Sequence, residues 1–127
     1  MRLQINFIKI RKSKVRMRAI QMLGVTMNLS DYVVVGEFSN DGTSEMCIFL
    51  ELTCEEVYLS PGHKIQLLAK PSEGLLPISI GYSEKGLQIY PNREFDPDWH
   101  IRFKDIVIKA GYPTRVADLE AQYDINT

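Results

Sequence analysis

Short segments of strand-forming residues, separated by clusters of turn-forming residues, recur along most of this chain. Residues 32–38 and 46–52 are rich in β-branched and aromatic side chains, and a Ser-Asn-Asp-Gly-Thr cluster separates them. Such segments favour β-strands, and the dipeptide Asp41-Gly42 favours the positive φ that a tight hairpin turn requires. The sequence therefore predicts that these two segments pair with each other as a β-hairpin.

Further segments have the same character, and turn residues separate them as well. They are residues 55–59, 64–70, 76–82, 86–90, 99–103 and 106–109. Pro61 and Gly62 fit the two central positions of a type II turn, and the polar residues 83–85 predict a second hairpin. Pro77 and Gly81 are typical of an edge strand or a bulge, because proline cannot donate to the hydrogen bonds of a sheet.

The last part of the chain has a different period. Val116, Leu119 and Tyr123 recur at helical spacing, and Thr114 is predicted to cap a short helix there. The chain has 127 residues, which is the length of one domain. We therefore expect a single mainly β domain over residues 1–127. It should be an antiparallel β-sandwich or partly open barrel of about eight to nine short strands, with a short C-terminal helix.

Charge is distributed unevenly along the chain. The first 30 residues contain seven basic residues and no acid, whereas the rest contains eight basic residues and all sixteen acids. Lys12, Lys14, Arg16 and Arg18 alternate with uncharged residues, so a strand would place them on one face. The alternation favours a strand, although residues 12–23 also fit a helix. This basic face is expected either to balance the protein's own acids or, as an alternative function, to bind nucleic acid.

The acidic remainder suggests a surface that binds a protein. Acidic and aromatic residues gather in one loop and beside it, and we expect six of them to contact a partner: Glu94, Asp96, Asp98, Tyr90, Phe95 and Trp99. A negative surface speeds association with a basic protein, and aromatic anchors dominate the energetics of interfaces. The main hypothesis is a non-catalytic protein-binding module of the immunity or inhibitor type, which neutralises a basic partner such as a bacterial toxin nuclease.

Few residues suggest catalysis or cofactor binding. Of the two histidines, His63 lies in a predicted turn and is expected to contact solvent, whereas His100 follows the acidic loop. A hydrolase that uses His100 with a neighbouring carboxylate is the enzymatic alternative. The two cysteines lack the spacing of a zinc site, and the scattered glycines do not form a phosphate-binding loop. We therefore expect no catalytic residues, no metal and no cofactor.

The remaining expectations concern thiols and cellular location. Cys47 and Cys54 are too few for a disulfide framework, and both are expected to be reduced. The basic start is not followed by a run of about 7–15 apolar residues, so no secretory signal is predicted. The longest uncharged stretch is too short and too polar to span a membrane. A cytoplasmic protein that does not bind membranes is expected, and the sequence leaves its oligomeric state open.

Overall fold

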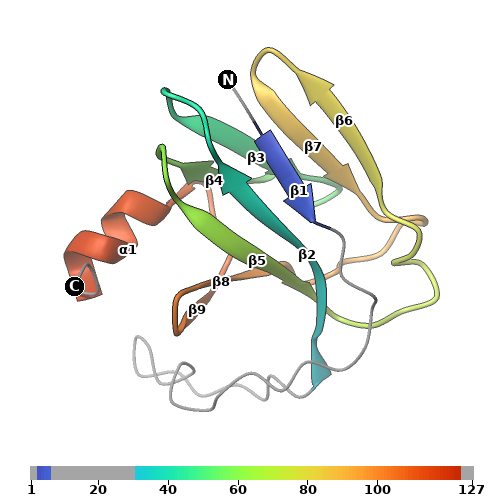
Figure 1. Cartoon of the computed structure of the whole chain (residues 1–127). Helices are drawn as coiled ribbons and strands as arrows, with labels where there is room; N and C mark the ends of the chain where they lie inside the picture. Colours follow the sequence, from blue (N-terminus) through green and yellow to red (C-terminus); the bar gives the residue numbers. More distant parts are fainter. Residues whose placement is uncertain (1–2, 7–30, 124–127) are drawn as a thin grey trace.

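The computed structural model describes residues 3–6 and 31–123, which form two β-sheets and one helix (Figure 1). The strands are β1 (Leu3–Asn6), β2 (Val33–Asn40), β3 (Met46–Leu50), β4 (Glu55–Leu59), β5 (Lys64–Ala69), β6 (Ser79–Ser83), β7 (Gly86–Tyr90), β8 (His100–Phe103), β9 (Ile106–Lys109) and β10 (Thr114–Arg115). The helix is α1 (Val116–Tyr123). Within the described residues, no helix is long and apolar enough to cross a membrane.

The two five-stranded sheets pack as a sandwich. The first sheet has the strand order β1-β2-β5-β8-β9, and every neighbouring pair in it is antiparallel. The second sheet has the order β10-β4-β3-β7-β6 and is mixed, because β3 pairs with β7, and β4 with β10, in parallel. The predicted mainly β sandwich with a C-terminal helix is confirmed, but its second sheet is not purely antiparallel.

Apolar side chains from both sheets form one buried cluster. Phe38 of β2, Val57 of β4 and Trp99, which precedes β8, are all 0% exposed. The two-residue period of a strand turns such side chains to one face of each sheet. Each contributes about 1.5–3 kcal/mol of hydrophobic stabilisation, before the entropic cost of ordering is counted. Val116 and Leu119 extend the cluster onto α1, which explains why so short a helix is held against the sandwich.

The predicted hairpin between β2 and β3 is wrong, because these strands lie in different sheets. The buried side chain of Asn40 accounts for the difference. Its Nδ2 donates to Ser44 O at 2.9 Å and to Leu59 O at 2.8 Å, and its Oδ1 accepts from Gly42 N–H at 2.9 Å. These bonds tie the connection to β4, so the chain crosses to the second sheet instead of folding back on β2. Among the described glycines, positive φ occurs at Gly62 and Gly86 and not at Gly42.

The predictions of a second hairpin, a type II turn and a C-terminal helix are confirmed, whereas the predicted helix cap is wrong. β6 and β7 form the second hairpin, and β6 is an edge strand. Gly62 has a φ of +87°, and His63 N–H donates to Ser60 O at 3.0 Å, as a type II turn requires. The helix forms where its spacing predicted it, but Thr114 does not cap it. Thr114 lies in β10, two residues before α1, and its Oγ1 accepts from Gly111 N–H at 2.8 Å.

Candidate functional site

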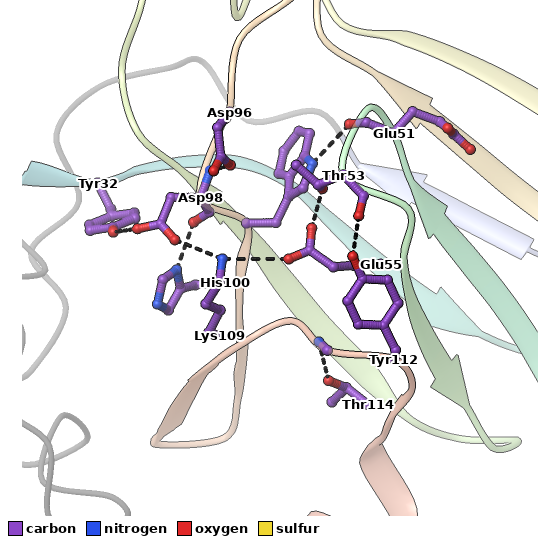
Figure 2. Close-up of polar contacts among 12 residues, drawn as sticks. Tyr32, Glu51, Thr53, Glu55, Asp96, Asp98, His100, Lys109, Tyr112 and Thr114 are labelled. Atoms are coloured by element: carbon purple, nitrogen blue, oxygen red, sulfur yellow. Dashed lines mark hydrogen bonds and ion pairs between the residues drawn. The ribbon is translucent and has the colours of Figure 1, made fainter.

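A network of charged and polar side chains connects the two sheets (Figure 2). Lys109 Nζ, at the end of β9, donates to Asp98 Oδ1 at 2.8 Å and lies 3.4 Å from Glu55 Oε2, at the start of β4. Asp98 also accepts a hydrogen bond from the Tyr32 hydroxyl, and Glu55 accepts one from the Thr53 hydroxyl. The Lys109 ammonium group therefore links Asp98, which lies before β8 of the first sheet, to Glu55, which begins β4 of the second sheet.

The network keeps its charges fixed at neutral pH. Burial opposes the charge of Asp98, but hydrogen bonds from Lys109 and Tyr32 outweigh it and lower the pKa of this carboxyl. Burial also opposes the charge of Lys109, yet the bond to Asp98 and the charges of Asp98 and Glu55 raise its pKa. Burial, and then the bond to Asp98, raise the pKa of Tyr32. At neutral pH Asp98 is therefore an anion, Lys109 a cation and Tyr32 a neutral phenol. Groups whose protonation states are fixed in this way support a structural role better than proton transfer.

His100 lies beside this network but bonds to backbone. It is 5% exposed, and its Nδ1 lies 2.7 Å from the carbonyl oxygen of Asp98, so Nδ1 carries the proton and donates. The ring meets Tyr32 edge-on, with 4.9 Å between the two ring centroids. Burial lowers the pKa of His100 below its ordinary value of 6.5. The imidazole is therefore neutral at pH 7, and its Nδ1 proton points to a carbonyl rather than to a carboxylate.

Acidification below about pH 6.5 is expected to destabilise the protein through His100. Folding lowers the pKa of this histidine, so the unfolded chain binds the proton at a higher pH than the folded chain does. The free energy of unfolding therefore falls as the pH drops from 6.5 towards the folded pKa. Asp98, whose pKa folding also lowers, adds a second loss only below its ordinary value of 3.8.

Urea unfolding between pH 7.5 and pH 4.5, at intervals of about half a unit, measures this dependence. The substitution His100→Asn keeps a donor near the Asp98 carbonyl and removes the titrating group, so it should flatten the slope. An equally steep slope in His100→Asn and in the wild type would contradict the assignment to His100.

Two exposed apolar side chains lie next to the network. Leu52 is 45% exposed and Tyr112 is 70% exposed. The loop that carries Leu52 is held from two sides, because the Tyr112 hydroxyl donates to Thr53 O at 2.6 Å and Trp99 Nε1 donates to Glu51 O at 3.0 Å. We call these residues together the loop face: Glu51, Leu52, Thr53, Asp96 and Tyr112. Figure 2 labels all of them except Leu52.

Negative charge exceeds positive charge around the loop face. Within residues 31–123, neither Glu51 nor Asp96 belongs to an ion pair, whereas Glu55 and Asp98 share Lys109. Among the charged residues labelled in Figure 2, four carboxylates therefore accompany one ammonium group. Glu55 is buried, so Glu51, Asp96 and the half-buried Asp98 are the carboxylates that reach the surface. A surface of this kind attracts a positively charged partner and repels a polyanion.

The six residues of the predicted partner surface differ in burial. Glu94 and Asp96 are exposed, Asp98 is half-buried within the network, and Tyr90 is half-buried at the end of β7. Phe95 is also partly buried and packs against the core.

The expectation for Trp99 needs correction, because its side chain is 0% exposed and cannot serve as a surface anchor. Its indole N–H bonds to Glu51 O inside the protein, which allows the whole ring to be buried. Trp99 therefore supports the loop face from beneath instead of contacting a partner.

The prediction that His63 contacts solvent is wrong, because the residue is buried and only 8% exposed. Its Nδ1 accepts from Ser60 N–H at 3.0 Å, and its Nε2 lies 2.9 Å from Glu120 Oε1 on α1. The histidine therefore joins the turn before β5 to the helix. The alternative nucleic-acid surface, Lys12, Lys14, Arg16 and Arg18, lies outside the described residues.

Sequence reasoning did not assign Leu52, Tyr112 or Lys109 to the site. A tyrosine between Gly111 and Pro113 was a usable signal, because a large side chain in a turn is seldom buried. Leu52 and Lys109 gave no comparable signal, since each simply ends a predicted strand.

The described residues give little support for metal or thiol chemistry. Among the described residues, no three His, Cys, Asp or Glu side chains are placed to hold a metal ion. Cys47 and Cys54 are both free thiols, as predicted, and burial raises the pKa of Cys47 to about 11. The exposed Cys54 lies beside the loop face, in the same loop as Leu52.

No known protein family, curated protein or solved structure matches this chain.

Proposed function

We propose that this protein is a non-catalytic protein-binding module that binds a basic partner through the loop face. The proposal rests on one observation: two exposed apolar side chains, Leu52 and Tyr112, lie beside a network in which carboxylates outnumber the single ammonium group. Tyrosine is among the residues that most often carry an interface's energy, and full burial of a leucine side chain contributes about 1.5–3 kcal/mol. Surrounding carboxylates raise the association rate with a basic partner and repel acidic ones.

Side-chain hydrogen bonds hold two positive-φ residues in place beside the loop face. Cys54 and Asp98 have φ values of +62° and +50°, a region that costs residues other than glycine about 1–3 kcal/mol unless their surroundings hold them there. Here the bonds to Tyr112, Trp99 and Lys109 supply those surroundings. A surface fixed before the partner arrives loses less conformational entropy on binding.

Among basic partners, we propose a nuclease of the toxin type. An enzyme that acts on nucleic acid presents a positive cleft to the phosphate backbone. An acidic protein surface complements such a cleft and can block it. In this role the chain is an immunity or inhibitor protein, and nucleic acid should compete with it for the nuclease.

The two alternative functions lead to different experiments. A hydrolase that uses His100 would lose activity in His100→Ala, although the burial of His100 and its bond to the Asp98 carbonyl favour a structural role. Nucleic-acid binding by Lys12, Lys14, Arg16 and Arg18 predicts a salt-dependent titration with RNA or single-stranded DNA. A flat titration at low salt would exclude that alternative.

Loss of the Leu52 side chain is expected to weaken partner binding at least about tenfold, because its burial contributes about 1.5–3 kcal/mol. The tagged full-length chain and its Leu52→Ala variant would be immobilised in equal amounts in an extract of the cells that encode the chain. A basic protein retained by the wild type is then purified, and its affinity for both chains is measured by calorimetry. Glu51→Lys should also slow association, most strongly at low salt.

Matched variants of exposed residues outside the loop face serve as controls. Leu76 is 41% exposed, close to the 45% of Leu52, and Glu73 is exposed. Leu76→Ala and Glu73→Lys should bind the partner as the wild type does. If Leu52→Ala and Leu76→Ala bind equally well, or if the wild type retains no basic protein, the loop face is not the binding surface.

A further inference from the structure

β6 forms one edge of the second sheet, and its outer backbone groups have no partner strand among the described residues (Figure 1). Its pairing with β7 runs without a bulge from Ser79↔Tyr90 to Ser83↔Gly86. Edge strands of monomeric proteins are commonly protected by charged side chains, proline, a bulge or a covering segment. The β6 sequence Ser-Ile-Gly-Tyr-Ser has neither a charge nor a proline.

The core-facing side of β6 is also incompletely covered. Ile80 pairs with Ile89 and Tyr82 with Leu87, and directly paired residues point to the same face of a sheet. Ile89 and Leu87 belong to the core, and Ile80 packs against it. Tyr82, however, is 67% exposed. The apolar face of the second sheet therefore continues beyond the part that the first sheet covers.

We propose that two copies of this chain pair through β6, antiparallel and centred on Gly81. In this register Ile80 of each copy lies opposite Tyr82 of the other copy, and Ser79 of each copy lies opposite Ser83 of the other. Pairs of an aromatic and a β-branched residue are among the favourable cross-strand contacts. The nearest charged residues, Glu84 and Lys85, fall opposite Ile78 and Pro77 of the second copy, so like charges do not meet. The register therefore pairs each aromatic ring with a β-branched side chain and brings no like charges together.

The hydrogen-bonding pattern of β6 agrees with the same register. Alternate residues of an antiparallel strand direct their N–H and C=O groups to opposite edges. Only two residues, Glu84 and Lys85, separate Ser83 from Gly86. The residues that flank a two-residue hairpin turn form a hydrogen-bonded pair, so the backbone groups of Ser83 point to β7. Gly81 then faces β7, whereas Ile80 and Tyr82 direct their backbone groups to the free edge. Centring on Gly81 therefore makes each Ile80–Tyr82 contact a hydrogen-bonded pair.

Sedimentation equilibrium of the full chain over a wide range of concentrations tests the proposal. The wild type should form a dimer that dissociates on dilution, and Tyr82→Lys should weaken it at least about tenfold by placing an ammonium group against Ile80. Tyr112→Lys is the matched control, because Tyr112 is 70% exposed and lies on the loop face; it should dimerise like the wild type. A wild type that stays monomeric at every concentration, or an equal dimer in Tyr82→Lys, would overturn the proposal.

Cysteine cross-linking tests the register independently of any loss of stability. In a Cys54→Ser background, which removes the exposed thiol, Gly81→Cys should form a disulfide-linked dimer under mild oxidation. A Cβ at this position meets no atom closer than 3.5 Å, so the substitution is tolerated sterically. Ser79→Cys is the control, because its two copies would lie about 14 Å apart in this register, beyond disulfide reach. Equal cross-linking of the two variants would contradict pairing centred on Gly81.

Discussion

Replacing Gly86 with alanine is expected to destabilise the protein by about 3 kcal/mol or more. A Cβ at this position would lie 1.9 Å from the backbone oxygen of Cys47, and the φ of +141° is one that residues with side chains rarely adopt. Gly86 begins β7 and pairs with Cys47 of β3. The clash therefore falls on the parallel β3–β7 ladder, which links the outer hairpin to the rest of the second sheet.

Urea unfolding followed by circular dichroism measures this loss. Gly81→Ala is the matched control, because the nearest atom to its new Cβ is Gln88 Oε1 at 3.5 Å, an ordinary contact. The control should change the free energy of unfolding by less than about 1 kcal/mol. If both variants are equally stable, the close approach of β3 and β7 at Gly86 is not as described.

Trp99→Ala should cost about 3–5 kcal/mol of unfolding free energy. The side chain is the largest of those that are fully buried, and its removal leaves a cavity in the cluster that both sheets share. The loop that carries Leu52 also loses the support of the Trp99 Nε1–Glu51 bond. Trp99→Ala is therefore expected to weaken partner binding as well as stability.

Circular dichroism is the suitable probe for Trp99→Ala, because Trp99 is the protein's one tryptophan and its fluorescence is lost with it. Trp99→Phe refills most of the volume but leaves Glu51 O without its donor, so it should cost about 1–3 kcal/mol. A cost below about 1 kcal/mol for Trp99→Ala would mean that the indole does not fill the core.

Local sequence signals predicted the strands but not how the strands pair across the fold. The β-branched and aromatic segments, the Pro61–Gly62 turn and the β6–β7 hairpin all depend on neighbouring residues, and all were predicted. The partner of β2 depends instead on the buried side chain of Asn40, which ties the next loop to β4. A polar residue at the end of a strand has many roles, and sequence alone does not distinguish them.

The candidate site was predicted in part. The acidic character of the loop before β8 was evident, and Asp96 is exposed there. Trp99 was assigned to the surface because an aromatic residue beside acids resembles an interface anchor, but its ring is in the core. The bridge from Asp98 through Lys109 to Glu55 joins residues from two sheets. No local pattern marks such a contact, since it exists only once the sheets have packed.

Hydrogen–deuterium exchange of the full chain, with and without its purified protein partner, tests the loop face directly. The amides of residues 51–56, of Asp96 and Asp98, and of residues 111–112 should exchange more slowly in the complex, while the turn at residues 41–45 should be unchanged. Binding that protects other segments and leaves these three unprotected would show that the loop face is not where the partner binds.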